Sequence, residues 1–71
     1  MLKDDINSYV EMQRAMGFKY RTQNYLLQSY SRFAEQLGET VVHSQTVIEW
    51  AGMAPSSYQK RNRLLTVRRF A

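Results

Sequence analysis

Residues 56–71 read SSYQKRNRLLTVRRFA, and this stretch carries the strongest signals for both fold and function. It contains five of the ten basic residues and no acidic residue. Pro55 and the serines that follow form a helix start signal, because a serine hydroxyl can accept a hydrogen bond from a free backbone N–H of the first turn. We therefore predict a basic helix that begins at Ser56 or Ser57 and continues to the end of the stretch. Its predicted inner face holds Leu64, Val67 and Ala71.

Three further helices are predicted upstream, because apolar residues recur at helical spacing and no stretch alternates with a period of two. The first is closed by Gly17 and the second by Gly38, since glycine readily adopts the left-handed conformation that ends a helix. The fold class is thus all-α, a compact orthogonal bundle of four helices. The first two helices are predicted to span residues 2–16 and 23–37. The third is predicted to follow an N-cap at Ser44 or Thr46 and to end at Met53.

The second helix has the clearest amphipathic pattern. Thr22 is its predicted N-cap. One apolar stripe is predicted to face the core, namely Leu26, Tyr30, Phe33 and Leu37. The opposite side is predicted to hold Asn24, Gln28, Ser31 and Glu35.

Apolar and aromatic residues at helical phases supply the predicted core of the bundle. In the third helix Val47, Ile48 and Ala51 share a face, with Trp50 beside them. Aromatic residues dominate small cores, so most of those in this chain are expected inside. They are Tyr9, Phe18, Tyr25, Tyr30, Phe33, Trp50, Tyr58 and Phe70.

Composition excludes several classes of function. The chain has no cysteine, which removes disulfides and thiolate metal sites, and its single histidine, His43, removes histidine-cluster metal sites. The acidic residues are scattered and the three glycines stand singly, so no catalytic residue, metal or cofactor is expected. No apolar run is long enough for a membrane span, and the N-terminus lacks a signal peptide. We expect a cytoplasmic protein.

Positive charge is concentrated in two windows. The formal net charge is +4, yet residues 51–71 alone contribute five bases and no acid. A second window without acids covers residues 12–34. Two such windows can form one phosphate-binding face if the fold brings them together.

Both windows also carry side chains that suit duplex DNA. Arginine pairs with guanine and asparagine or glutamine with adenine in the major groove, while Lys and Arg neutralise phosphates. A helix start additionally presents free N–H groups to a phosphate. The candidate contacts near the second helix are Lys19, Arg21, Thr22, Asn24 and Gln28. Those in the fourth helix are Gln59, Lys60, Asn62, Arg63, Thr66 and Arg69.

The order of these motifs resembles the N-terminal core-binding domain of the tyrosine recombinase (phage integrase) family. The resemblance lies in Gly17-Phe18-Lys19-Tyr20-Arg21-Thr22, then Tyr25, then Tyr30-Ser31-Arg32-Phe33. The last helix adds Arg61, Arg63-Leu64, Val67-Arg68 and Phe70-Ala71, so the likeness extends from Ile6 to Ala71. Tyr58 departs from it, since the family often has threonine or another small polar residue there.

The resemblance implies a SAM-like domain over residues 1–71 that forms one arm of a clamp around recombination-site DNA in a mobile element. It also implies a C-terminal catalytic domain beyond this chain, whose tyrosine breaks and rejoins strands during integration and recombination. The implied partners are double-stranded DNA, that catalytic domain and other recombinase protomers, with no membrane. The tyrosines of this chain are not expected to be nucleophiles, so this domain by itself is not an enzyme.

Two other interpretations remain open. A free-standing helix-turn-helix regulator would use the turn at residues 52–55 between its two helices. A helical protein–protein interaction module would expose an apolar patch, for which Leu65 and Phe70 are the candidates, because they lie off the predicted inner face of the last helix.

Overall fold

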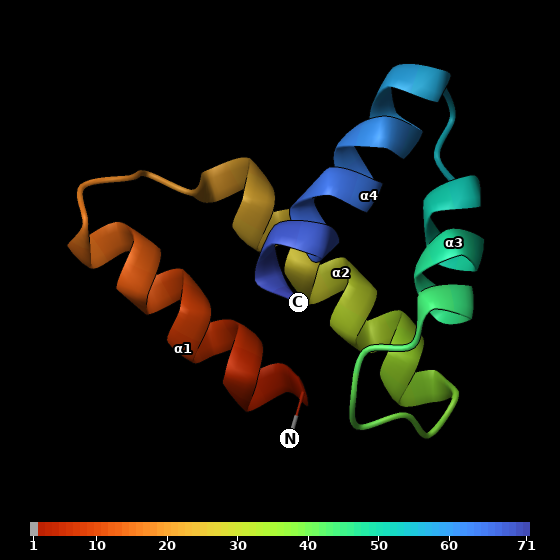
Figure 1. The fold of residues 1–71 in the computed structure, drawn as a ribbon, viewed down its shortest axis with the longest axis horizontal. Helices are drawn as coiled ribbons and strands as arrows, with labels where there is room; N and C mark the ends of the chain where they lie inside the picture. Colours follow the sequence, from red (N-terminus) through yellow and green to blue (C-terminus); the bar gives the residue numbers. More distant parts are fainter. Residues whose placement is uncertain (1) are drawn as a thin grey trace.

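The computed structural model describes residues 2–71, and Met1, the first residue of the predicted domain, lies outside that part. It contains the helices α1 (Leu2–Ala15), α2 (Arg21–Gln36), α3 (Ser44–Gly52) and α4 (Ser57–Phe70), with no strand among the described residues. The predicted all-α class with four helices is confirmed. Helix α2 is central and packs against α1, α3 and α4, as Figure 1 shows.

Two glycines end the first two helices as predicted. Gly17 and Gly38 have φ values of +97° and +73°, in the left-handed region where a side chain would add strain. After Gly17, the N–H of Phe18 donates back to the carbonyl of Gln13 at 3.2 Å. The same six-to-one hydrogen bond follows Gly38, and both satisfy carbonyls that the helix end would leave free.

The predicted helix starts are correct in one case and wrong in two. Ser56 precedes α4, and its hydroxyl accepts a hydrogen bond from the Gln59 N–H at 3.2 Å, which confirms the predicted cap. Thr22 is not a cap, because α2 already begins at Arg21 after Tyr20, which lies in the left-handed conformation (φ 54°). Neither Ser44 nor Thr46 caps α3, since the helix follows His43, which makes no side-chain cap hydrogen bond. The Thr46 hydroxyl donates instead to the Glu39 carboxylate at 2.8 Å.

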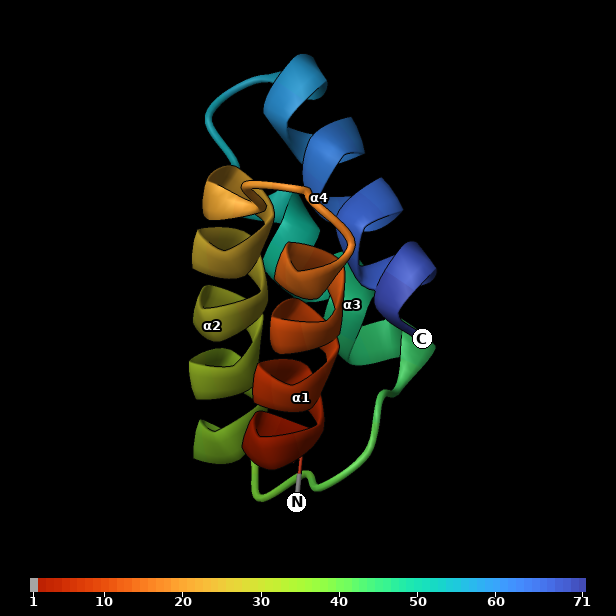
Figure 2. The ribbon, with the colours of Figure 1, turned by 90° about the vertical axis from the view of Figure 1, so that its left-hand side faces the viewer.

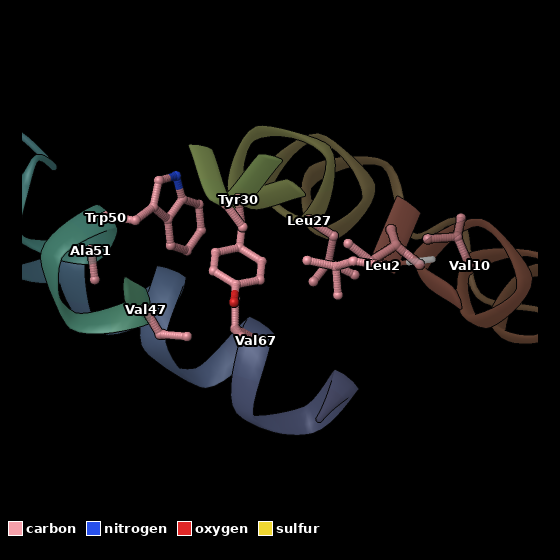
Figure 3. Close-up of a cluster of buried hydrophobic side chains, with 10 residues drawn as sticks. Leu2, Val10, Leu27, Tyr30, Val47, Trp50, Ala51 and Val67 are labelled. Carbon is pink, nitrogen blue, oxygen red and sulfur yellow. The ribbon is translucent and has the colours of Figure 1, made fainter. Parts of the chain in front are cut away.

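The core centres on a contact between α2 and α3. Tyr30 is fully buried, and its ring meets that of Trp50 edge to face at 5.5 Å. Figure 3 shows Tyr30 projecting between Trp50 and Leu27, with its hydroxyl beside Val67 of α4. The indole N–H of Trp50 donates to the Ser29 hydroxyl at 3.2 Å. Burial raises the pKa of Tyr30, so the phenol is neutral in the core.

The buried face of α2 differs from the predicted stripe. Leu27, Tyr30, Ser31 and Ala34 are buried, whereas Leu26 and Phe33 are half-buried and Leu37 is exposed. Ser31 was expected on the opposite side. The buried face of α2 is therefore rotated from the predicted stripe by about one residue toward the C-terminus. The small side chains of Ser31 and Ala34 allow neighbouring helices to pack closely against this face.

The buried faces of α3 and α4 also need correction. Ile48 is exposed, and Thr46 takes a place in the buried face of α3 instead. In α4, Val67 is buried as predicted, but Leu64 is half-buried and Ala71 is exposed. The short α3 thus buries fewer apolar side chains than its composition suggests.

Removing the Ser56 cap is expected to lower the free energy of unfolding by about 1 kcal/mol, because the Gln59 N–H would lose its acceptor. Urea unfolding of Ser56→Ala, followed by circular dichroism, would measure this. Ser57→Ala is the matched control, since Ser57 is the first residue inside the helix and should change stability by less than about 0.5 kcal/mol. Equal midpoints for the two variants would contradict the assignment of the cap.

Candidate nucleic-acid interface

The N-terminal ends of α2 and α4 lie at the same end of the bundle. Figures 1 and 2 both show these two helix starts in the upper part of the view. In Figure 2 the connection from α3 to α4 lies above the upper end of α2. The first residues of α4, from Ser57 to Asn62, are all exposed. Both helix starts are therefore accessible from one direction.

Residues from both basic windows line one hollow of about 600 Å³, here called the basic hollow. Lys19 and Arg21 come from the connector and the first residue of α2, and Arg69 comes from the last turn of α4. The complete lining is Tyr9, Gln13, Phe18, Lys19, Tyr20, Arg21, Thr22, Gln23 and Arg69. The fold thus brings together cations that are about fifty residues apart in the sequence.

Three aromatic rings pack edge to face beside the basic hollow. Tyr9 meets Tyr20 at 5.7 Å and Phe70 at 5.4 Å, both edge to face, and so joins α1 to the connector and to α4. The Tyr20 hydroxyl donates to the Tyr9 hydroxyl at 3.1 Å. Burial raises the pKa of Tyr20, and the hydrogen bond to Tyr9 acts in the same direction. The phenol is therefore neutral at physiological pH and adds no negative charge beside the cations.

A second hollow of about 500 Å³, here called the amide groove, lies between the N-terminal halves of α2 and α4. Gln59 and Asn62 face it from α4, and Thr22 belongs to both hollows. The complete lining is Thr22, Tyr25, Leu26, Pro55, Tyr58, Gln59, Asn62 and Arg63. The two hollows therefore form one continuous surface around the start of α2.

Three of the predicted contact residues are occupied within the fold. The Arg63 guanidinium donates to the main-chain carbonyl of Trp50 at 3.0 Å and lies 5.0 Å from the centre of its ring. Thr66 is buried, and its hydroxyl donates to the carbonyl of Asn62 at 2.8 Å. The Gln28 amide donates to Asn7 at 2.8 Å and to Asn24 at 3.3 Å. These hydrogen bonds occupy donor groups of all three side chains, so Arg63, Thr66 and Gln28 are not included among the proposed DNA contacts.

Six of the other eight predicted contacts line at least one of the two hollows. Lys19, Arg21, Thr22 and Arg69 line the basic hollow, and Gln59 and Asn62 line the amide groove. Lys60 is exposed in the first turn of α4 but lines neither hollow. Asn24 is half-buried and accepts the hydrogen bond from Gln28.

Sequence reasoning missed the role of two tyrosines. Tyr25 and Tyr58 were expected in the core, but they are 67% and 75% exposed and line the amide groove. One signal was present: Tyr58 lies in the first turn of α4, and the residues three and four positions after it, Arg61 and Asn62, are polar. Phe18 is likewise exposed, at the rim of the basic hollow.

A third hollow, of about 330 Å³, lies between α3 and α4 and is mainly apolar. Val47, Ile48 and Leu64 contribute to it, with Arg68 at its edge. Leu65 is exposed as expected, whereas Phe70 is half-buried with its ring packed on Tyr9, so these two residues do not form a shared exposed patch. Neither residue lines this hollow.

Replacing Arg63 by alanine is expected to lower the free energy of unfolding by about 1–3 kcal/mol, since the Trp50 carbonyl would lose a charged donor and the indole its cation. Urea unfolding followed by circular dichroism would measure the change. Arg61→Ala removes the same charge from an exposed position two residues earlier and should stay within about 0.5 kcal/mol of the parent chain. If Arg63→Ala lowered the free energy of unfolding no more than Arg61→Ala does, the structural role of Arg63 would be contradicted.

Within residues 2–71 no helix has the length and apolarity to cross a membrane. The same part of the chain contains no group of three or more His, Cys, Asp or Glu side chains that could hold a metal ion. Comparison with protein-family models, curated proteins and solved structures finds no match for this chain.

Proposed function

We propose that this domain binds double-stranded DNA through the surface formed by the basic hollow and the amide groove. The observation that carries the proposal is the convergence of Lys19, Arg21 and Arg69 on one hollow at the uncapped start of α2. Cations and free helix N–H groups together suit a phosphate. The adjoining groove offers amides, which suit base edges in the major groove.

The finer proposal is that the domain acts as the N-terminal clamp arm of a tyrosine recombinase. The order of motifs from Gly17 to Ala71 supports it, together with the placement of the α2 and α4 starts on one surface. A reading frame that continues into an Arg…His-x-x-Arg…Tyr pattern would support this assignment. A helix-turn-helix regulator would share the DNA contacts of α4, so it differs in biological role and not in the binding chemistry proposed here.

Fluorescence anisotropy with a labelled duplex, measured over a series of salt concentrations, tests the binding proposal. Three phosphate contacts should give a slope of about −2.7 for the logarithm of the binding constant against that of the salt concentration. A duplex should bind more tightly than its separate strands. No binding at low salt, or binding that does not depend on salt, would contradict the proposal.

One observation favours a second candidate function, self-association. The apolar hollow between α3 and α4 is open to solvent, and the exposed Ile48 forms part of its lining. Sedimentation equilibrium that shows a dimer, together with no duplex binding at low salt, would favour this function over DNA binding.

A further inference from the structure

The amide groove has a composition that distinguishes between base pairs. Gln59 and Asn62 direct their side chains to it, and neither side-chain amide makes a hydrogen bond within residues 2–71. The internal hydrogen bonds at these two positions use only main-chain atoms, the Gln59 N–H and the Asn62 carbonyl. Both amides therefore remain available for the paired donor and acceptor that adenine presents in the major groove.

The cation that could read guanine is held away from this groove. Guanine is recognised mainly by Arg or Lys, which donate to its O6 and N7 atoms. Among the lining residues Arg63 is the single cation, and its guanidinium is bound to the carbonyl and the ring of Trp50. Releasing it would break contacts that join α4 to α3. The groove consequently presents amides without a free guanine-reading group.

The walls of the groove add apolar surface. Tyr25 lines it from α2 and Tyr58 from α4, and both rings are largely exposed. Pro55 and Leu26 contribute further apolar atoms. In the major groove the C5-methyl group of thymine is the apolar feature that such surfaces contact. Aromatic walls and central amides together match the two partners of one A·T pair.

We propose that the amide groove selects A·T base pairs in the major groove, with Asn62 and Gln59 as adenine readers and Tyr25 and Tyr58 as contacts for the thymine methyl. The basic hollow, which shares Thr22 with the groove, holds the neighbouring phosphate backbone. This inference rests on the proposed DNA binding and adds its sequence preference.

Alternating duplexes of equal length test the preference without knowledge of a target site. Alternating A·T should bind about fivefold or more tightly than alternating G·C, since a bidentate base contact discriminates at least that strongly. An inosine–cytosine duplex separates the two grooves: its major groove presents the guanine acceptors, while its minor groove resembles that of A·T. It should bind as weakly as G·C. Replacing thymine by uracil, which removes only the methyl group, should weaken binding about threefold.

Two variants connect the preference to its residues. Asn62→Ala should reduce the A·T preference, and Tyr58→Ala should reduce the difference between thymine and uracil, because only Tyr25 would still contact the methyl group. Both positions are exposed, so circular dichroism should show an intact fold. Arg61→Ala, also exposed on α4 but outside the groove, should lower affinity for every duplex equally and leave the preference unchanged.

The outcomes separate the inference from the proposed function. Tight, salt-dependent binding with equal affinity for A·T and G·C duplexes would overturn the inference and leave DNA binding intact. Equal binding of A·T and inosine–cytosine would also overturn it, because the discrimination would then lie in the minor groove. Stronger binding to single strands, lost in Tyr58→Ala, would show base stacking instead. Failure to bind any duplex would contradict both proposals.

Discussion

Replacing Trp50 by alanine is expected to leave the domain largely unfolded at room temperature. Trp50 is 2% exposed, meets Tyr30 at 5.5 Å, and binds Ser29 and Arg63 through its N–H and its carbonyl. Truncating a buried tryptophan costs about 3–5 kcal/mol. A core of this size supplies about the same net stability. Circular dichroism at 222 nm should therefore show most of the helical signal lost.

Two controls accompany the Trp50 variant. Trp50→Phe retains a ring against Tyr30 but loses the hydrogen bond to Ser29, so it should remain folded with a lower urea midpoint. Phe18→Ala truncates an aromatic side chain that is 57% exposed and should change the free energy of unfolding by less than about 1 kcal/mol. A cooperative transition of Trp50→Ala close to that of the parent chain would contradict the described core.

Reversing two charges in the basic hollow is expected to abolish most of the proposed DNA affinity. Lys19→Glu with Arg69→Glu would remove two phosphate contacts that lie about fifty residues apart in the sequence and meet in this hollow. The binding constant should fall on the order of 50-fold at about 0.1 M salt, and the salt slope should become shallower by about 1.8. Anisotropy titrations at several salt concentrations measure both quantities.

The matched control changes the net charge by the same amount elsewhere on the surface. Lys3→Glu with Arg32→Glu alters two exposed bases that line neither the basic hollow nor the amide groove. This pair should lower affinity only a few-fold, mainly at low salt, because its effect is long-range and screened. Equal losses for the two double variants would mean that net charge, and not this surface, determines binding.

The positions of the helices could be predicted because their signals are local. Gly17 and Gly38 close two helices through backbone conformations that glycine favours, and Ser56 caps α4 through its own hydroxyl. Two N-caps were predicted wrongly for reasons that the helix start signals do not contain. Tyr20 adopts a left-handed conformation that is uncommon for tyrosine, and the Thr46 hydroxyl donates to Glu39, seven residues earlier in the sequence.

The orientation of each helix was harder to predict, because it depends on which neighbours it meets. Leu26 and Leu27 are adjacent and equally apolar, so the pattern alone does not decide which of them faces the core. Helix α2 packs against three other helices, which favours Leu27 together with the small Ser31 and Ala34. Periodicity cannot anticipate this broad face.

The candidate site was only partly visible in the sequence. Charge windows and amide positions predicted the two segments, and the structure places Lys19, Arg21 and Arg69 around one hollow. The role of Arg63 could not be foreseen, since its partner Trp50 lies thirteen residues away and is reached through the turn between α3 and α4. The signal for Tyr58 was only its polar surroundings in the first turn of α4, because its 75% exposure also depends on how far the start of this helix extends past the bundle.

Mapping amide chemical shifts of the ¹⁵N-labelled domain during titration with a duplex tests the central claim most directly. DNA binding by the proposed surface predicts the largest shifts at residues 19–25, at residues 57–62 and at Arg69. These shifts should weaken together as salt is added, because they report one electrostatic interface. Shifts confined to the apolar hollow around Ile48 and Leu64, or no shifts at low salt, would contradict the proposal that this surface binds DNA.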